Sequence, residues 1–490
     1  MTDLVDQTRR PRAKPAPKGA QKVVVLGAGP AGVGAALRLA KADLAQVQVL
    51  ERQAAPGGNS GSFQLDGIWC DFGSHRLHPV TEPHVLGDIK EAVGDDLLWR
   101  PRHGRIRLQK RWIHFPLKPA DLLAKLPKTF AASLMLDAAT KPLRRKTKGE
   151  ESFATVLRAG LGPTISENFY FPYVRKLWAL PPEELAVTLA KRRVSGSSIG
   201  KILMKVARQI PGLKGKTTGG FYYPRKGFGQ ITERLAAQAE SHGAAFVFGA
   251  EVTGVEHAGG RVTGVRYKKD GQDLASKSDA VWSTLPISLL VRLMDPVAPP
   301  EVLEAAKKIR YRGMILIYLI LEQDQFSEYD AHYFPELATP MARMSEPKNY
   351  SASIEPKGRT ILCAELPCDP NEPYWSMSDD ELGRSMCAWL GAVGLPVTAK
   401  VNRTVTRRLG QAYPVYDRHY EESFRVMDEW IASIRGVLTF GRQGLFAHDN
   451  THHALAMAYA AAECLAPTGE FDLDRWAEHR RVFETHVVED

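Results

Sequence analysis

A single stretch near the N-terminus, residues 23–51, limits the fold more than any other. Four apolar residues lead directly into Gly27-Ala28-Gly29-Pro30-Ala31-Gly32, an amphipathic helical pattern follows, and a second apolar run ends at Glu51. Gly27 permits a tight turn, Gly29 lets the backbone approach a pyrophosphate, and Gly32 lets the helix lie close to the strands. The helix N-terminus then faces the phosphates, and Glu51 can accept from ribose hydroxyls. This order of elements predicts a βαβ dinucleotide-binding unit.

Length and composition indicate an ordinary multidomain globular protein. The 490 residues suffice for two or more domains, and the hydrophobic share of 44% and charged share of 24% are typical of globular chains. The five cysteines are scattered and include no CxxC pair. We therefore expect a reducing compartment, with neither a disulfide framework nor a metal site.

The ends and the apolar runs of the chain indicate where it resides. Residues 1–19 are polar and basic without an apolar core segment, which predicts a disordered tail and no signal peptide. The longest apolar runs, Met314 to Leu321 and Ala454 to Ala462, are too short to cross a bilayer. We expect a cytoplasmic protein that does not span the membrane.

Positive charge is concentrated in one part of the chain. The net charge is +10, and residues 100–148 contain fourteen Lys or Arg against only Asp121 and Asp137. Such a segment can be a solvated face, can meet a phosphate-bearing substrate, or can contact an anionic membrane surface. Nucleic acid is not expected as a partner, because no nucleic-acid-binding fold accompanies the charge.

An apolar repeat beside these charges keeps the membrane reading open. Leu122, Leu126, Phe130 and Leu134 recur every four residues, as in a helix that lies on a surface. Pro127 would kink or break that helix, and packing into a core gives the same spacing. Peripheral contact with an anionic membrane therefore remains one alternative.

A second glycine-rich turn follows the first fingerprint. It contains Gly57-Gly58-Asn59 and is followed by Gly73-Ser74-His75. Glycines here can let the ribityl chain and diphosphate of a flavin pass close to backbone N–H groups, although a plain hairpin would use them too. Strands are predicted at Ala245 to Phe248, Glu251 to Glu256 and Arg261 to Tyr267, on the far side of a helical, basic middle region. Two further strands are predicted at Met314 to Leu321 and Thr360 to Leu366, in a sheet that would floor a substrate pocket.

These segments together resemble a superfamily of FAD-dependent flavoproteins. It includes amine oxidases, protoporphyrinogen oxidase, carotenoid desaturases and UDP-galactopyranose mutase. The matching segments are the fingerprint with Glu51, the Gly57-Gly58 loop, the Asp71 to His75 segment, the Phe221 to Gly229 segment and Phe440-Gly441-Arg442. The resemblance implies an α/β fold, in which a Rossmann-like FAD-binding domain is interleaved with an α+β substrate domain.

The resemblance also implies domain boundaries. The FAD-binding domain would combine residues 20–84, 217–286 and 402–470, and the substrate-binding domain residues 85–216 and 287–401. Residues 471–490 would form a C-terminal helical tail.

The expected FAD-binding residues come from the fingerprint, the second loop and the resemblance. They are Gly27, Gly29, Pro30, Ala31, Gly32, Glu51, Arg52, Gly57, Gly58, Asn59, Gly73, Ser74, His75, Val252, Gly441, Arg442, Asn450 and Thr451. A helix that starts near Asn450 would direct its N-terminal dipole at the pyrimidine side of the flavin. The reactive ring is thus expected between His75 and this helix, far from the fingerprint.

Two branches of the superfamily are both represented in the motifs. Asn59 after the paired glycines, and the run Gly73 to His78, look like the galactopyranose mutases. The run Phe221 to Gly229 looks like protoporphyrinogen oxidase and the desaturases. An oxidase or desaturase uses the flavin to take a hydride, whereas a mutase uses reduced FAD as a nucleophile on a nucleotide sugar without net redox.

Candidate catalytic groups follow from these two readings. His75, Arg175 and Arg343 are the main candidates, with His78, Lys176 and Arg193 as further groups that could meet the flavin or an anionic substrate. Each is also explained as a structural or solvated side chain, and aromatic core packing explains Tyr413 and Tyr416 as well as a pocket wall does. We expect an FAD-dependent oxidoreductase that takes hydride from a small hydrophobic or phosphate-bearing, lipid-like substrate, with the mutase reaction as the alternative.

Overall fold

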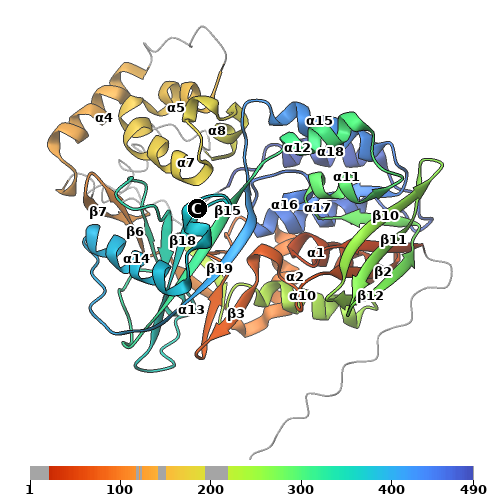
Figure 1. Cartoon of the computed structure of the whole chain (residues 1–490), viewed down its shortest axis with the longest axis horizontal. Coiled ribbons are helices and arrows are strands. Elements are labelled where there is room, and N and C mark those ends of the chain that lie inside the picture. Colours follow the sequence, from red (N-terminus) through yellow and green to blue (C-terminus); the bar gives the residue numbers. More distant parts are fainter. Residues whose placement is uncertain (1–20, 117–120, 122–123, 142–150, 194–218, 489–490) are drawn as a thin grey trace, which may run out of the picture.

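A computed structural model describes residues 21–116, 121, 124–141, 151–193 and 219–488. The expected N-terminal tail, Leu122 and the side chain of Arg193 lie outside the described residues. Figure 1 shows two halves, one built on the dinucleotide-binding sheet and the other on a second large sheet with a helical lobe above it.

The first half contains a five-stranded parallel sheet. Its order is β20 (Val437–Thr439), β13 (Ala280–Ser283), β1 (Lys22–Leu26), β2 (Gln46–Glu51) and β9 (Ala245–Phe248). Successive residues of β1 alternate between two cores, because strand side chains point to opposite faces. Val23 and Val25 pack in the cluster that includes α1 (Pro30–Lys41), whereas Val24 and Leu26 pack in the cluster on the other face. Burial on both faces explains the unbroken apolar run.

Helices cover both faces of this sheet. On the α1 side lie α2 (Pro83–Val93), α10 (Gln230–Ser241), α17 (Thr451–Glu463) and α18 (Leu473–Phe483), and on the other side α11 (Ile287–Leu293), α12 (Pro300–Lys308) and α15 (Tyr420–Ala432). Residues 287–308, which we assigned to the substrate domain, thus cover the dinucleotide-binding sheet. Trp476 and Phe483 of α18 are buried in the α1 cluster, so this C-terminal segment is a docked helix.

The second half contains a seven-stranded mixed sheet. Its order is β19 (Val401–Pro414), β15 (Tyr311–Leu321), β18 (Thr360–Pro367), β17 (Arg343–Ser345), β16 (Ala331–Tyr333), β6 (Gly104–Leu108) and β7 (Arg111–Phe115). Residues 402–414, which we placed in the FAD-binding domain, therefore belong to this sheet through antiparallel pairing of β19 with β15. The expected strands at Met314 and Thr360 are confirmed as β15 and β18.

Smaller elements connect the halves. One sheet has the order β12 (Gln272–Lys277), β11 (Arg261–Lys269), β10 (Glu251–Ala258) and β14 (Met294–Asp295). A hairpin joins β3 (Ser62–Leu65) to β4 (Ile68–Asp71), and β5 (Leu97–Pro101) pairs antiparallel with the distant β8 (Gly220–Pro224). Helices α13 (Pro347–Ser351) and α14 (Asp379–Ala392) flank the seven-stranded sheet, and α16 (Gly441–Gly444) follows β20.

The basic middle region forms a helical lobe. It comprises α4 (Lys128–Thr140), α5 (Phe153–Leu161), α6 (Pro163–Ile165), α7 (Phe171–Trp178) and α8 (Val187–Arg193). Pro127 precedes α4 as its N-cap residue, so the helix starts at the proline instead of running through it. Leu126 and Phe130 are buried against Leu108 and Ile113 of β6 and β7. Three of the four residues of the apolar repeat, Leu126, Phe130 and Leu134, therefore pack in a core cluster.

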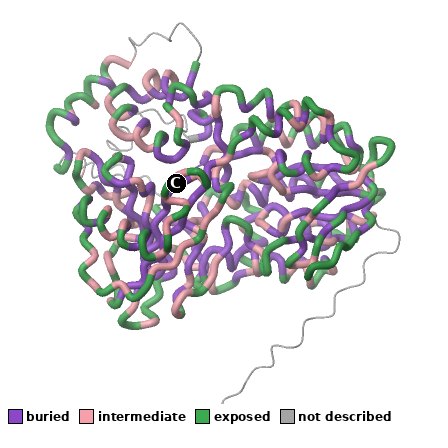
Figure 2. The backbone as a smooth tube through the Cα atoms, in the orientation of Figure 1, coloured by how far each residue is buried: buried purple, intermediate pink, exposed green. Residues whose placement is uncertain are grey.

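The fold class expected from the sequence is confirmed. Parallel and antiparallel sheets share one chain that passes between the two halves several times, and Figure 2 shows buried residues concentrated in the interior of both halves. No helix among the described residues is long and apolar enough to cross a membrane.

Candidate functional site

The N-terminus of α1 offers an open cradle for a diphosphate. Gly29 is its N-cap residue, no side chain caps the helix, and no acid lies in its first turn. A Cβ added at Gly29 would meet only the Gly58 Cα, at 3.8 Å, whereas a Cβ at Gly32 would lie 1.9 Å from the Gly27 oxygen. Gly32 is thus required for helix–strand packing, while Gly29 faces open space. An anion there would meet the positive end of a helix whose first N–H groups no side chain caps.

Glu51 closes the fingerprint at the end of β2. Its Oε2 accepts from the Ala28 N–H at 2.8 Å and its Oε1 from the Gln53 N–H at 2.8 Å. Only 8% of the residue is exposed. The two bonds fix the carboxylate beside the glycine turn, at the place where a nucleotide ribose would lie.

Two distant glycine segments reach the same helix end. Gly57 donates its N–H to Ala28 O at 2.9 Å, and Gly58 lies against Gly29. From the other end of the chain, a Cβ on Gly441 would lie 2.7 Å from the Ala31 Cβ. Positive φ angles of +137° at Gly57 and +78° at Gly441 explain why both positions are glycine.

Asp71 ties the second loop to the Phe221 to Gly229 segment. Its carboxylate accepts from Ser62 Oγ at 2.6 Å, from Tyr223 Oη at 2.7 Å and from the Phe228 N–H at 2.8 Å. Burial raises the Asp71 pKa to about 6, although the three hydrogen bonds oppose the rise. Sequence reasoning missed this residue as a site residue, although it stands in the quoted Asp71 to His75 motif.

His75 lies at the centre of the candidate site. Its ring stacks on Phe228 with centroids 5.3 Å apart, and its enclosed Nδ1 makes no hydrogen bond of normal geometry. Burial, and then the charges of Arg343 and Arg442, lower the His75 pKa to about 3. The imidazole is therefore neutral at physiological pH.

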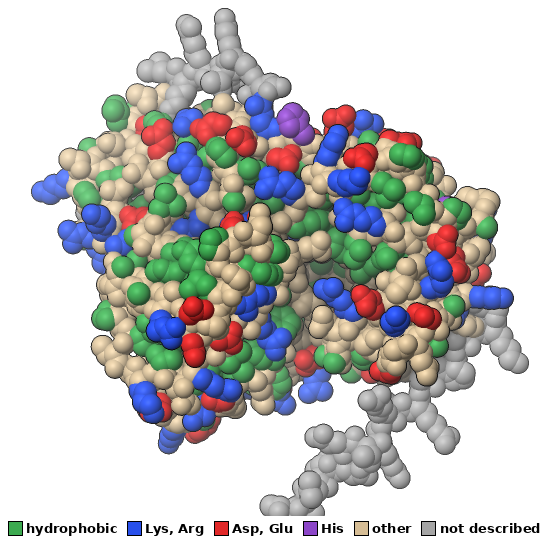
Figure 3. Space-filling view, viewed as in Figure 1, with side chains coloured by type: hydrophobic (Ala, Val, Ile, Leu, Met, Phe, Trp, Pro, Cys, Tyr) green, Lys and Arg blue, Asp and Glu red, His purple; other side chains and the backbone are tan. Residues whose placement is uncertain are grey.

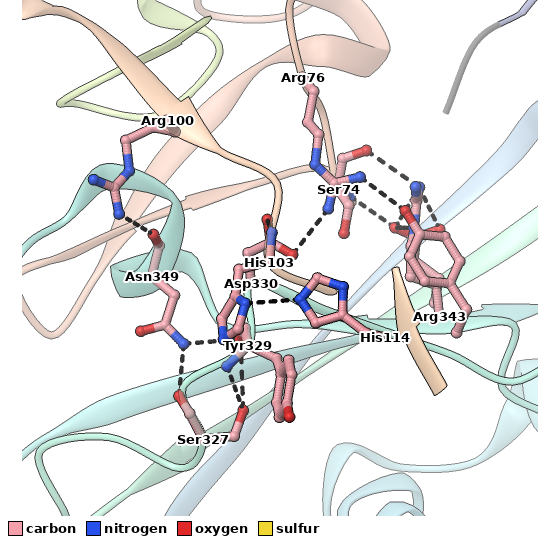
Figure 4. Close-up of polar contacts among 12 residues, drawn as sticks. Ser74, Arg76, Arg100, His103, His114, Ser327, Tyr329, Asp330, Arg343 and Asn349 are labelled. Atoms are coloured by element: carbon pink, nitrogen blue, oxygen red, sulfur yellow. Dashed lines mark hydrogen bonds and ion pairs between the residues drawn. The ribbon is translucent and has the colours of Figure 1, made fainter. Parts of the chain in front are cut away.

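Arg343 holds the loop that carries His75. Its guanidinium makes two bonds to Glu365, at 3.0 and 2.9 Å, and a third to the Ser74 carbonyl at 3.2 Å. Glu365 Oε1 also accepts from the Ser74 N–H at 2.7 Å. Figure 4 shows Arg343 beside Ser74 in this arrangement. Burial opposes the charge of Arg343, but Glu365 outweighs it, so the Arg343 pKa lies above its ordinary value.

A second arginine holds the other end of the loop. Arg76 donates to Asp330 at 3.2 Å and to Tyr333 Oη at 2.8 Å, and its guanidinium lies over the Tyr350 ring at 5.1 Å. Asp330 in turn accepts from the His103 N–H at 3.3 Å (Figure 4). The segment from Ser74 to Arg76 is therefore fixed to the seven-stranded sheet on both sides of His75.

Aromatic side chains from three elements surround Arg343. Tyr173 of α7, Tyr333 of β16 and Tyr413 of β19 all act on its charge, and its guanidinium lies 5.8 Å from the Tyr333 ring centroid. Arg442 lies over the Tyr413 ring at 5.2 Å. Figure 3 shows a recess between the two halves of the molecule, bordered by Lys and Arg side chains.

The C-terminal segment brings a helix N-terminus toward this region. Arg442 donates to Ala412 O at 2.9 Å and to Asp449 O at 3.1 Å, which fixes the chain just before α17. Asn450 is the N-cap residue of α17, and its N–H donates to His453 Nδ1 at 3.3 Å. The expected helix start is confirmed. The buried alanines of α17 allow close approach to α1, since a Cβ on Gly34 would lie 3.2 Å from the Ala458 Cβ.

Asp449 gathers three segments at the start of α17. Its carboxylate accepts from Arg192 at 3.1 Å and pairs with His486 Nδ1 at 3.0 Å, and the donor atoms of Asp449, His453 and His486 lie within 4.8 Å of one another. Arg192 occupies one carboxylate oxygen, and the His453 and His486 rings are stacked nearly parallel, at 15°. A cation at this carboxylate would be repelled by Arg192. We therefore interpret the cluster as a set of contacts that holds the C-terminal segment against the start of α17.

Other residues expected at the site lie elsewhere or are engaged. Arg175 is exposed on α7, two positions along the helix from the inward Tyr173 and therefore on another face. Lys176 is buried and donates to the carbonyls of Glu336 and Met341 at 2.7 and 2.9 Å, and to that of Phe334. Burial lowers the Lys176 pKa to about 7. In these positions, neither Lys176 nor Arg175 can reach a substrate near His75.

The remaining candidates divide in the same way. Tyr416 is buried, donates to Phe446 O at 2.8 Å and accepts from the His448 N–H, so it is a core residue. His78 is also buried, whereas Asn59 and Arg52 are exposed at the rim of the cradle. Val252 lies in β10 and is half-buried, and Thr451 begins α17.

Glu365 and Asp449 were missed by the sequence reasoning. Glu365 is the one charged residue in the otherwise apolar strand Thr360–Pro367, and a buried carboxylate in such a strand is itself a signal of a required partner. Asp449 stands in the polar run that precedes the alanine-rich helix.

The described residues fit a bound flavin dinucleotide. One part of the described structure offers a glycine cradle with uncapped helix N–H groups, another offers the N-terminus of α17, and the His75 Nδ1 is enclosed without a hydrogen bond of normal geometry. The fold and site thus define a flavin-dinucleotide enzyme.

Comparison with known proteins identifies the family. Residues 30–457 match the model of the flavin containing amine oxidoreductases, and the chain belongs to this family. FAD is its cofactor, and the chain is an FAD-dependent oxidoreductase. The chain is 24% identical over 417 residues to the zeta-carotene-forming phytoene desaturase of Myxococcus xanthus, a match that covers 77% of this chain and 78% of the relative.

Solved structures share the fold at lower identity. Reduced UDP-galactopyranose mutase superposes with a TM-score of 0.79 at 20% identity, covering 96% of this chain and all (100%) of that chain. A putative protoporphyrinogen oxidase from Exiguobacterium sp. 255-15 superposes with a TM-score of 0.68 at 18% identity, covering 90% of this chain and 98% of the other. Both branches suggested by the motifs are thus represented among its structural neighbours.

Proposed function

We propose that the chain uses FAD to remove a hydride from carbon in a hydrophobic, lipid-like substrate. The observation that carries this proposal is that the two carboxylates near His75 among the described residues, those of Glu365 and Asp71, are both engaged by hydrogen-bond donors. Glu365 is engaged by Arg343 and Ser74, Asp71 is engaged by three donors, and His75 is held neutral. Hydride removal from a hydrocarbon would leave a cation on carbon, which becomes a double bond when the neighbouring carbon loses a proton. Such a cation is acidic enough to give that proton to water or to a weak base such as the neutral His75, so the step would depend on orientation and on the electron acceptor more than on a strong base.

Each residue has a role in this reaction that follows from its contacts. The flavin would supply the electron acceptor, and its diphosphate would be held by Gly29, Gly58 and the N-terminus of α1. Arg343 and Glu365 position the Ser74–His75 backbone. Because His75 is neutral, it would add no charge beside an apolar substrate. Tyr173, Tyr333 and Tyr413 offer ring faces to an apolar chain. Arg442 fixes the start of α17, whose positive end favours negative charge on the reduced cofactor.

The relatives agree with a lipophilic substrate. The M. xanthus protein is a phytoene desaturase, and phytoene is a hydrocarbon. A substrate with a phosphate group would need a free cation, and the inner Arg343 is already neutralised by Glu365. We therefore favour an apolar reacting part over an anionic one.

A mutase-like reaction on a nucleotide sugar is the second candidate. The observation that favours it is the pair of arginines, Arg343 and Arg442, whose charges both act on His75. In that reading they would face a diphosphate, and the flavin would act in its reduced form without net redox.

Anaerobic reduction separates the two functions. The purified yellow protein is mixed without oxygen with a panel of polyenes, other lipophilic compounds and nucleotide sugars. Bleaching of the flavin by a lipophilic compound supports the proposal. Conversion of a nucleotide sugar that occurs only after dithionite pre-reduction, with no bleaching by any substrate, would refute it and favour the mutase reaction.

A further inference from the structure

Helix α4 is apolar on two opposite faces. One face packs inward through Phe130 and the partly buried Leu134, where the buried Asp137 also accepts from the Thr164 N–H at 2.8 Å. The opposite face carries Ala132, Met135, Leu136 and Ala139 at helical spacing, and all four are exposed. A helix that is apolar all round is normally buried on all sides.

The exposed face lies at the outer edge of the helical lobe. Figure 1 shows α4 at the periphery of the molecule, and Figure 2 shows exposed residues along it. Met135 is 61% and Leu136 64% exposed. Neighbouring large apolar side chains this exposed on one short helix mark an interaction surface more than isolated ones do.

Charge around this face selects the partner. Lys125 and Lys128 precede or begin the helix and are exposed, and Lys141 follows it. Of the two acids of this part of the chain, Asp137 is buried, and Asp121 accepts from the His114 N–H at 2.7 Å and pairs with Lys125 at 2.6 Å. The surface is therefore apolar in its centre, with Lys128 at one end and Lys141 at the other adding positive charge, which is the pattern that binds an anionic bilayer.

We infer that the exposed face of α4 docks on an anionic lipid surface. Met135 and Leu136 enter the boundary between headgroups and acyl chains, and the lysines contact the headgroups. This is the face opposite the Leu126–Phe130–Leu134 repeat. The inference stands on α4 alone, and it would also bring a lipid-like substrate of the proposed reaction close to the enzyme.

Vesicle binding tests the inference without turnover, so its outcome is independent of the proposed function. The full holoenzyme is sedimented with vesicles of phosphatidylcholine alone, or mixed with phosphatidylglycerol. Binding is expected only to the mixed vesicles and should weaken in high salt. The double variant Met135→Gln/Leu136→Gln, which keeps good helix formers, should bind at least about 10-fold more weakly.

A matched control uses large apolar side chains on other segments that are at least as exposed as Met135 and Leu136. Val297 and Ile354 are 74% and 73% exposed, and Val297→Gln/Ile354→Gln should bind like the unchanged protein. Thermal unfolding and the visible flavin spectrum of both variants should be unchanged. Absence of binding to any vesicle, or equal loss in the control variant, overturns the inference. So does a dimer in light scattering that the α4 variant alone dissociates, because the face would then belong to a second copy of the chain.

Discussion

Replacing Glu365 by glutamine tests how the candidate site is held together. The substitution keeps the shape of the side chain but removes the charge that neutralises Arg343, of which only 15% of the side chain is exposed. Breaking a buried ion pair by removing one partner costs about 3–5 kcal/mol, and the glutamine oxygen retains one acceptor. We therefore expect Glu365→Gln to lower the free energy of unfolding by about 2–3 kcal/mol.

The same sheet supplies a matched control. Arg312 pairs with Glu372 at 3.2 Å through Nη2 and with Asp369 at 2.7 Å, so Glu372→Gln leaves this arginine one carboxylate. The control should lose about 1 kcal/mol. Denaturant titration at neutral pH measures both losses.

The cofactor provides the second readout of this prediction. Glu365 anchors the Ser74 N–H beside His75, whereas Glu372 lies in the segment after β18 and bonds to Arg312. Glu365→Gln should therefore weaken FAD binding to the apoprotein and shift the visible flavin spectrum, and Glu372→Gln should do neither. The reasoning is refuted if the two variants lose equal stability and the flavin spectrum changes in neither.

Three further outcomes follow from the structure. Gly29→Ala should preserve folding but reduce bound FAD, whereas Gly32→Ala should destabilise the chain, because only its Cβ would clash with backbone, at 1.9 Å; equal flavin content in the purified Gly29→Ala protein would contradict this. Lys176→Met leaves the carbonyls of Phe334, Glu336 and Met341 without their donor, so it should lower the free energy of unfolding by about 2–3 kcal/mol and leave the flavin spectrum unchanged; a spectral change would place Lys176 at the site instead. Burial lowers the pKa of His452 to about 3 and of His453 to about 4, so the folded state binds fewer protons than the unfolded state below pH 6.5. The stability they contribute is present above pH 6.5 and falls by on the order of 1 kcal/mol each at pH 5.5; a double His→Gln variant should show a smaller loss between pH 7.5 and 5.5, and an unchanged loss would contradict the assignment.

Local sequence patterns were sufficient for the cofactor end of the molecule. The strand, glycine turn, helix and second strand between Lys22 and Glu51 are encoded by neighbouring residues, and the start of α17 by a polar run before alanines. The sequence also located β15 and β18, which are almost entirely apolar segments. The sequence could not assign β19 to one of the two halves, because a half-exposed strand has the same residue pattern in either sheet. Only its pairing with β15 shows which sheet it belongs to.

The substrate end depends on contacts between distant residues. Arg343 and Lys176 look equally free in the sequence, yet one is paired with a carboxylate 22 residues away and the other with carbonyls about 160 residues away. Arg175 and Tyr173 lie on different faces of α7, and the sequence alone does not show which of these faces turns toward the site. The charge of a side chain is readable from the sequence, but whether that charge is neutralised is a property of the packed structure.

The structure of the FAD-bound protein tests the central claim most directly. The account predicts that the cofactor's diphosphate lies over Gly29 and Gly58, and that its isoalloxazine ring lies beside His75 with the start of α17 at its pyrimidine edge. An isoalloxazine ring found away from His75, with the His75 and Arg442 side chains facing protein alone, would contradict it.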